Sequence, residues 1–290
     1  MGTPSVRQNE QQAVIRPILD LAPLPVVAQR LLDDLADDDA SIAGLSAIIE
    51  LDPGLTARIV GLANSAYFAS PSPVYSVQDA ITRVLGLNMV RSVALGIALN
   101  APFDTRRCRP FQLDRYWFVA MATAWLARSL APRLPPESAV ATDLAYLGGM
   151  MHNFGLIVLA SAFPAEMSNV LNRSAIQPEA DMASLEEDEI GINHHLAAGA
   201  LARKWHLPPA VVAAVESGGR PDDSPEFRGM CRLIDLCANQ AHALYFREER
   251  QADPAALEAL GLNTARFAGQ REKLRGKVEE IETLARQMAG

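Results

Sequence analysis

The sequence has few cysteines and none of the spacings that would make cysteine a structural residue. Cys108, Cys231 and Cys237 are odd in number and form no CxxC or zinc-ribbon pattern, which favours buried thiols in a reducing compartment. The first residues also lack the basic and apolar regions of a secretory signal peptide. We therefore expect a cytoplasmic protein without structural disulfides.

Basic charge is also scarce, because 26 Lys and Arg face 34 Asp and Glu, for a net charge of −8. Proteins that bind nucleic acid gain most of their affinity from Lys and Arg that neutralise phosphates. The balance therefore predicts no nucleic-acid partner. One basic segment stands out, Arg106-Arg107-Cys108-Arg109, which we interpret as a solvated loop between two lobes in preference to a phosphate or partner site.

The chain contains no long run of alternating β-branched residues, whereas apolar residues recur at helical spacing almost throughout. This predicts an all-α protein. Residues 144–163 carry no formal charge when His152 is neutral, and such a length would suffice to cross a bilayer. Because glycines and the His152-Asn153 pair lie at its centre, we predict a bent pair of buried helices and no membrane span.

The helical pattern divides the chain into segments of different character. Residues 1–12 form a polar lead-in, 13–105 an N-terminal lobe of short helices, 106–250 a second lobe of longer helices, and 251–290 a C-terminal extension packed on the bundle. We therefore predict a two-lobed helical bundle. Long helices are expected over 113–130 and about 226–246, and a charged surface helix over 268–288.

Several polar residues are placed where a helix should begin or end. Ser41, Ser76 and Ser184 each precede a helical pattern, and their hydroxyl groups can accept hydrogen bonds from the free N–H groups of a first turn. Asn64 follows an apolar run and is expected to close a helix by bonding to backbone groups; recognition of a partner is the alternative.

The segment Gly149-Met150-Met151-His152-Asn153-Phe154-Gly155 places a His-Asn pair in uncharged surroundings. A metal-dependent phosphohydrolase uses His-Asp at such a position, since divalent cations are held largely by the negative charge on carboxylate oxygens. Asn153 keeps the shape of aspartate and lacks its charge. The sequence therefore predicts a site that has lost part of its ability to bind a metal.

Motifs spread over residues 15–245 resemble the HDOD family, the HD-related output domains. Those in the first half are Leu24-Pro25, Leu51-Asp52-Pro53-Gly54-Leu55-Thr56-Ala57-Arg58, Leu62-Ala63-Asn64-Ser65-Ala66, Ala80-Ile81 and Leu85-Gly86-Leu87. Those in the second half are Tyr116-Trp117, the segment Gly149 to Gly155, Glu186, Gly191-Ile192-Asn193-His194 and Trp205-His206-Leu207-Pro208. Their order along the chain makes the resemblance strong.

The resemblance implies an all-helical fold whose second lobe is related to HD-domain phosphohydrolases. Relatives with catalytic activity hold metal ions with histidines and aspartates, and each of those positions has a counterpart here. The counterparts are Val119, His152, Asn153, His194, Gly218, Gly219 and Asn239. His194 is preferred over His195 by spacing, and Asp235 remains an alternative to Asn239 for the late aspartate.

This pattern leaves two histidines without a firmly placed carboxylate, whereas a catalytic metal site typically has about three protein ligands. We therefore predict no cofactor and no catalytic residue, with His152 and His194 the candidates for adventitious zinc or nickel. Asp143 or Glu216 could in principle substitute as ligands. His152 is more readily explained as a core histidine, and His194 could be held by the nearby acidic residues 186–189.

By this resemblance the leading functional hypothesis is a non-catalytic signal-transduction output or scaffold module that acts through protein contacts. Its expected partners are signalling proteins, namely a receiver domain, a sensor kinase or a transcriptional regulator, and the family leads us to expect a receiver domain ahead of residue 1. Two alternatives remain open. One is a metal-dependent phosphohydrolase acting on nucleotides or cyclic dinucleotides, and the other a nucleotide or anion sensor binding at His152, Asn153 and His194.

Overall fold

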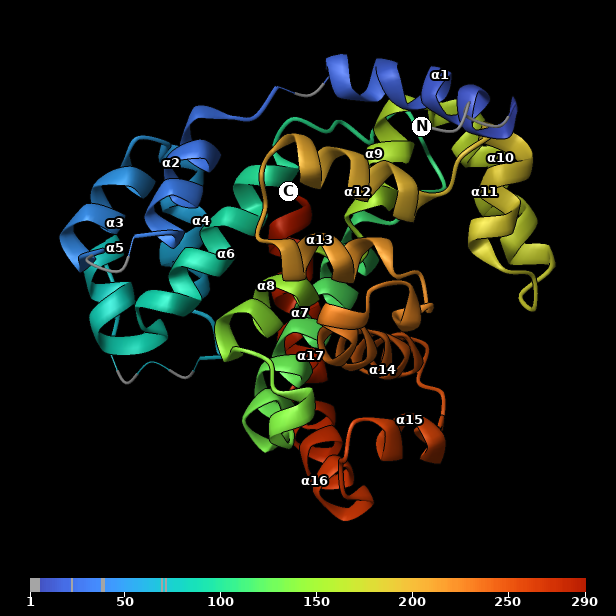
Figure 1. Cartoon of the computed structure of the whole chain (residues 1–290). Helices are drawn as coiled ribbons and strands as arrows, with labels where there is room; N and C mark the ends of the chain where they lie inside the picture. The colour runs from blue at the N-terminus through green and yellow to red at the C-terminus, as the bar shows by residue number, and fades with distance from the viewer. Residues whose placement is uncertain (1–5, 22, 38–39, 69, 71) are drawn as a thin grey trace.

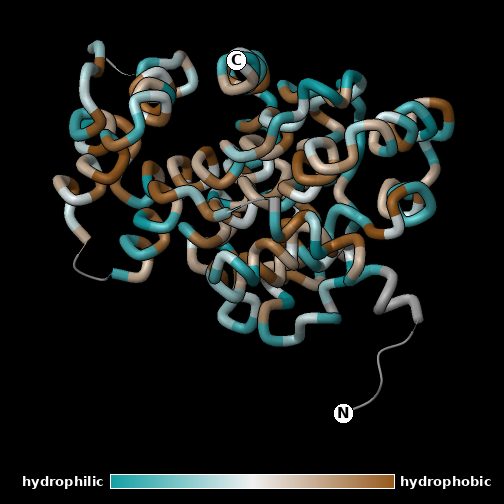
Figure 2. The backbone as a smooth tube through the Cα atoms, turned by 90° about the horizontal axis from the view of Figure 1, so that it is seen from above, coloured by the Kyte–Doolittle hydropathy of each residue, from teal (hydrophilic) through white to brown (hydrophobic). Residues whose placement is uncertain are grey.

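The structure, a computed structural model, describes residues 6–21, 23–37, 40–68, 70 and 72–290. Within these ranges the chain forms helices joined by turns and loops, without a β-strand (Figure 1). The predicted all-α fold is confirmed. In Figure 2 apolar segments run through the interior of the helical groups, while hydrophilic segments gather toward the outer turns.

The first group of helices lies to one side of the molecule (Figure 1). It comprises α2 (Val26–Leu35), α3 (Ile42–Glu50), α4 (Pro53–Ala63), α5 (Val77–Asp79), a π-helical turn (Ala80–Leu85) and α6 (Leu87–Asn100). Helix α6 is buried along most of its length and packs against α2, α4 and α8. A buried ion pair of 2.7 Å between Asp34 and Arg91 also joins α2 to α6. Helix α6 therefore connects this group to the rest of the protein.

The second group is built around the long helix α7. It comprises α7 (Leu113–Leu130), α8 (Thr142–Met151), α9 (Phe154–Ala162), α10 (Pro164–Ile176), α11 (Met182–Ile190), α12 (His194–Lys204), α13 (Pro209–Glu216) and α14 (Arg228–Tyr245). Short 3-10 turns cover Ala131–Arg133, Pro136–Ser138, Pro221–Asp223 and Pro225–Phe227. Helix α7 has the predicted bounds, and it packs most extensively against α8, α14 and the C-terminal helix α17 (Val278–Ala289).

Both ends of the chain are helical and pack on the second group. Helix α1 (Val6–Leu21) starts inside the expected polar lead-in and packs on α12 and α9, so by its contacts it belongs with the second group (Figure 1). At the other end α15 (Pro254–Ala259) precedes α16 (Thr264–Arg275) and α17 (Val278–Ala289).

The expectation of one continuous surface helix over 268–288 is wrong, because the chain breaks at Gly276 and Lys277 between α16 and α17. The break allows α17 to turn a buried apolar face onto α7. That face consists of Val278, Ile281, Leu284, Ala285 and Met288.

Most of the predicted helix ends are confirmed. The hydroxyl oxygens of Ser41 and Ser76 accept hydrogen bonds from Gly44 N and Asp79 N, each 3.0 Å long. Asn64 closes α4 and donates to the carbonyl oxygen of Val74 while accepting from Val74 N. The cap predicted at Ser184 is wrong, since Asp181 accepts the bond and α11 begins one turn earlier.

The apolar segment 144–163 forms the predicted bent pair, α8 and α9, at the centre of the protein. Among the described residues Pro136–Ala162 is the one stretch long and apolar enough to span a membrane by length and composition, and 78% of its apolar window is buried within the protein. Glycines permit this packing. A Cβ atom on Gly149 would lie 2.6 Å from the backbone nitrogen of Ala124 in α7, and one on Gly155 would overlap the His194 carbonyl.

We predict that Gly155→Ala destabilises the protein by about 3 kcal/mol or more, because the added methyl group meets the fixed backbone of α12 instead of a flexible side chain. Urea denaturation followed by circular dichroism measures the change. Gly269→Ala in α16 is the control, since nothing lies within 4 Å of its added methyl group. That variant should gain about 0.4–1 kcal/mol. Equal stability of Gly155→Ala and the wild type would contradict the packing described here.

Candidate functional site

The positions identified from the family pattern lie on elements that converge in the second group of helices. Val119 is on α7, His152 and Asn153 form the turn between α8 and α9, and His194 begins α12. Gly218 and Gly219 follow α13. Contacts of α7 with α8, of α9 with α12 and of α13 with α14 bring these elements together.

His152 ends α8 and folds back on its own helix. Its Nδ1 atom lies 2.7 Å from the carbonyl oxygen of Gly149. Because a carbonyl only accepts, Nδ1 carries the proton and Nε2 keeps a free lone pair. Burial lowers the pKa of His152 to about 4, against the opposing effect of the Gly149 carbonyl, and a positive charge on His194 would lower it further. The imidazole is therefore neutral at physiological pH.

Asn153 begins α9 and is buried, with 6% of its surface exposed. Its amide nitrogen donates a 3.2 Å hydrogen bond to the carbonyl oxygen of Tyr116 in α7. Its Oδ1 atom is buried without a hydrogen-bond partner among the described residues. An aspartate could not donate this bond, so the amide gives position 153 a structural link that a metal-binding carboxylate would lack.

His194 is held at the start of α12 by Glu186 of α11, which is fully buried. The Oε2 atom of Glu186 accepts from the backbone nitrogen of His194 at 2.8 Å and lies 2.5 Å from His194 Nδ1. Asn193 caps the same helix by accepting from Leu196 N. The expected association of His194 with the acidic residues 186–189 thus takes the form of one carboxylate bound to both backbone and ring.

His195, which spacing placed second to His194, also lies at the site. The two rings are tilted by 40° to one another with their centroids 3.9 Å apart, and His195 Nδ1 lies 3.2 Å from the carbonyl oxygen of Val215. Burial lowers the pKa of His195 to about 3, with a further contribution from the positive charge His194 would carry. The ring occupies the space beside Gly218, where an added Cβ would lie 2.8 Å from His195 Cδ2.

The two candidates for the late aspartate position, Asn239 and Asp235, have different surroundings on α14. Asn239 is exposed, and its amide donates to the backbone oxygen of Asp235 one turn earlier. Asp235 instead faces the turn after α13, where Ser217 and Gly219 hydrogen-bond to its carboxyl group. Burial raises the pKa of Asp235 to about 6 against the effect of these two bonds. Asp235, the alternative in the sequence, is therefore the acidic side chain directed toward the site.

His242, which lies near His152, and Arg115, which lies near His242, were not identified from the sequence. His242 lies two helical turns after Asp235 on α14, and this spacing places both on one face of the helix. Burial lowers the pKa of His242 to about 4. The positive charge of Arg115 and a positive charge on His152 would lower it in the same direction. The guanidinium of Arg115 lies 4.5 Å from the ring centroid of Phe246.

The two proposed substitute ligands have other partners. Asp143 accepts a 2.7 Å hydrogen bond from Asn88, and Glu216 forms an ion pair with Arg203. Val119 is buried in the core. Among the residues that the structure describes, no three or more His, Cys, Asp or Glu side chains are grouped so that they could hold a metal ion.

The basic segment 106–109 lies apart from these histidines, in the turn before α7. Arg106 forms a bidentate pair with Asp104, and its hydrogen bonds hold the pKa of that carboxyl at about 2. Arg107 and Arg109 are exposed, while Cys108 is buried. The segment is thus a solvent-facing loop with one buried anchor.

Both the sequence and the helical arrangement of this chain match those of known proteins. The sequence matches the HDOD domain over residues 21–221. The chain belongs to the HDOD family. This match covers the first group of helices and most of the second, and it ends just before α14.

Solved structures extend the similarity over nearly the whole chain. A provisionally assigned signal transduction protein from Marinobacter aquaeolei VT8 is 28% identical with a TM-score of 0.84, covering 98% of this chain and 66% of its own. A provisionally assigned phosphohydrolase from Shewanella amazonensis SB2B is 21% identical with a TM-score of 0.75, covering 95% and 98%. An HDOD domain protein of unknown function from Geobacter sulfurreducens is 19% identical with a TM-score of 0.73, covering 94% and 98%. The last two similarities establish the fold alone.

One curated relative, an uncharacterized protein of Treponema pallidum (strain Nichols), is 27% identical over 212 residues. That alignment covers 71% of this chain and 39% of the relative. The chain therefore spans well under half the length of this relative.

We predict that the free energy of unfolding falls as the pH drops from about 6.5 toward 4.5. His152, His195 and His242 have folded-state pKa values of about 4, 3 and 4 against 6.5 when unperturbed. The unfolded chain therefore binds more protons in this window, and each histidine lowers stability by about 1.4 kcal/mol per pH unit. Asp235 acts in the opposite direction between 3.8 and about 6, and three groups outweigh one.

Urea denaturation at a series of pH values measures this dependence. His195→Gln should reduce the dependence of the unfolding free energy on pH by about 1.4 kcal/mol per pH unit, since it removes one of the three histidines. Asp235→Asn should make the slope steeper, because it removes the opposing group. A slope that neither substitution changes would show that these residues do not titrate as described.

Proposed function

We propose that this HDOD chain is a signalling module that acts through protein contacts and does not hydrolyse phosphate esters. The observation that carries this proposal is the use made of the polar groups at the former ligand positions. Asn153 binds the Tyr116 carbonyl of α7, and the Glu186 carboxylate binds the backbone and ring of His194. These bonds join helices, which is a structural task.

The remaining positions support the same proposal by their chemistry. Val119 has an aliphatic side chain, and Gly218 and Gly219 have none. Both glycines have positive φ angles of 51° and 77°, so they serve the backbone of the turn after α13. The His195 ring fills the space beside Gly218. A ligand added at this position would therefore displace a packed side chain.

The phosphohydrolase alternative would need further ligands near His152 Nε2 and His194. Glu186 already holds His194 through its backbone and ring. Asp235 is a further acidic candidate, but burial raises its pKa and its carboxyl group is bonded to Ser217 and Gly219. The Shewanella structure carries a provisional phosphohydrolase name. At 21% identity, the similarity to that structure supports a shared fold and does not support phosphate-ester hydrolysis by this chain.

The anion-sensor alternative is disfavoured by the kind of atoms that remain available. Asn153 Oδ1 and Glu186 Oε1 are both buried acceptors without a partner among the described residues. A phosphate oxygen would meet acceptors there instead of donors, and such contacts are repulsive. Neutral histidines at physiological pH would offer little compensating charge.

A role in signalling is supported by the Marinobacter protein, which is 28% identical with a TM-score of 0.84 and carries a signal-transduction name. Receiver domains, sensor kinases and transcriptional regulators are the partners we propose. The greater length of the Treponema relative fits a module that works beside other domains.

We predict that tag-free protein, loaded with Mn²⁺, Fe²⁺, Zn²⁺ or Ni²⁺ in turn, hydrolyses neither a generic phosphodiester nor cyclic dinucleotides above the rate of buffer with metal. The reason is that two imidazoles without a carboxylate ligand do not fix a metal hydroxide. Product release followed by chromatography measures turnover, and elemental analysis measures bound metal.

His152→Ala is the matched variant for this assay. Stoichiometric metal together with turnover that His152→Ala abolishes would overturn the proposal. Turnover that persists in His152→Ala would indicate a contaminating enzyme and leave the expected result for the protein itself unchanged.

A further inference from the structure

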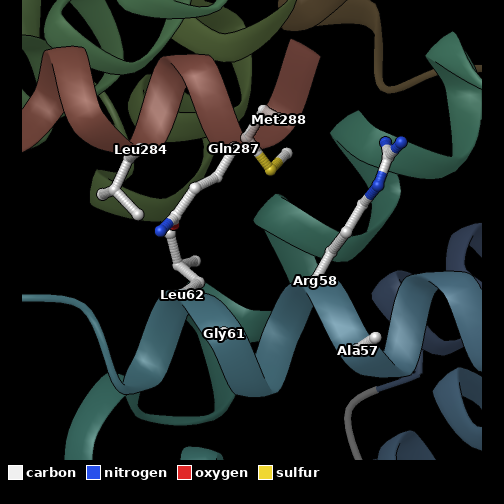
Figure 3. A pocket seen from close by; sticks show the side chains of 7 residues that line it. All are labelled: Ala57, Arg58, Gly61, Leu62, Leu284, Gln287 and Met288. Atoms are coloured by element: carbon white, nitrogen blue, oxygen red, sulfur yellow. The ribbon is translucent and has the colours of Figure 1, made fainter. Parts of the chain in front are cut away.

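A groove separates the first group of helices from the C-terminal helix. It lies between α4 and α17 and has a volume of about 250 Å³. Figure 3 shows the two helices on opposite sides of the gap, with the side chains that line it. Leu62, Leu284 and Met288 supply apolar surface, and Gly61 leaves open space, since nothing lies within 4 Å of an added Cβ. The groove is thus suited to aliphatic side chains.

The charge at this groove is positive although the chain as a whole is acidic. Arg58 is the charged residue in its lining, and no interaction of Arg58 occurs among the described residues. In α17, Glu280 pairs with Lys277 at 3.7 Å and Glu282 with Arg247 at 2.7 Å. The third carboxylate, Glu279, is exposed in the first turn of the helix, whereas the lining residues of α17 are Leu284, Gln287 and Met288. Arg286, next to the lining residue Gln287, is exposed. A complementary ligand therefore carries negative charge beside Arg58.

The segment after α4 and the start of α17 contact each other beside the groove. At the start of α17, Lys277 Nζ donates a 3.1 Å hydrogen bond to the Tyr67 carbonyl and lies 4.8 Å from the centroid of the Tyr67 ring. Tyr67 follows α4 in the chain. Toward its C-terminal end α17 instead faces α4 across the gap (Figure 3). An occupant would contact both α4 and α17, so its binding would be coupled to the spacing of these two helices.

We propose that this groove receives an amphipathic helix of a partner protein, with aliphatic side chains one turn apart in the gap and a carboxylate facing Arg58. A helix suits a gap bounded by two helices because residues i and i+4 project from one face. The carboxylate supplies a negatively charged partner for the Arg58 guanidinium. This inference rests on the proposed role in protein contacts and names the chemistry of the partner.

A displayed library of helical peptides, with a fixed aliphatic face and randomised flanking positions, tests the proposal on the full chain. We expect selection to enrich Asp or Glu at the flank, and amide chemical shifts of Gly61 and Leu62 to move when a selected peptide binds. Arg58→Glu should weaken such a peptide by about tenfold or more, as expected for a close charge pair. The same peptide with Lys in place of its acid should regain affinity for Arg58→Glu.

Gly61→Phe fills the groove and should abolish binding. Gly269→Phe is its matched control, because Gly269 is also a helical glycine with open space above it but lies outside the groove. Circular dichroism checks that both variants fold. If Gly61→Phe does not fold, the Arg58→Glu charge exchange decides the question.

The groove assignment is refuted by any of three results: no enriched helix, enrichment of basic flanks, or binding unaffected by Arg58→Glu. Selected helices that bind elsewhere would refute the groove and leave the protein-contact role standing. Metal-dependent turnover in the hydrolysis assay would count against that role independently of the peptide result.

Discussion

The close approach of α8 and α9 to their neighbours is the constraint on which the rest of this structure depends. Gly149 lets α8 lie against the backbone of α7, and Gly155 lets α9 lie against the start of α12. Interior packing is dense, so a single added carbon at such contacts would force helices apart. The same contacts set the positions of His152, Asn153 and His194. The site therefore exists because the glycines allow the backbones to meet.

Within that frame the polar groups of the site serve as links between helices. The Asn153 amide binds α7, and the Glu186 carboxylate fixes the start of α12. Burial keeps His152 and His195 neutral at physiological pH, so they pack without requiring a counter-ion. The surfaces of the protein, including the groove between α4 and α17, then become the place to look for function.

Local signals in the sequence were enough to predict the helical class, the bounds of α7 and the caps at Ser41 and Ser76, because each depends on nearby residues. They failed where distant contacts compete. The cap at Asp181 replaced that at Ser184, and the tail divided at Gly276 so that α17 could pack on α7. The placement of α1 on α12 joins residues far apart in the chain, and no local pattern encodes it.

For the site, the sequence by itself determined that Val119, Gly218 and Gly219 carry no side chain able to bind a metal, because this chemistry does not depend on the fold. Only the tertiary structure decided what the surviving groups do. It brought His195 and His242 to the same cluster, placed Asp235 against Ser217 while leaving Asn239 exposed, and bound Glu186 to His194. The physical reason is that hydrogen bonds and burial arise between elements, whose mutual positions are set by packing across the whole core.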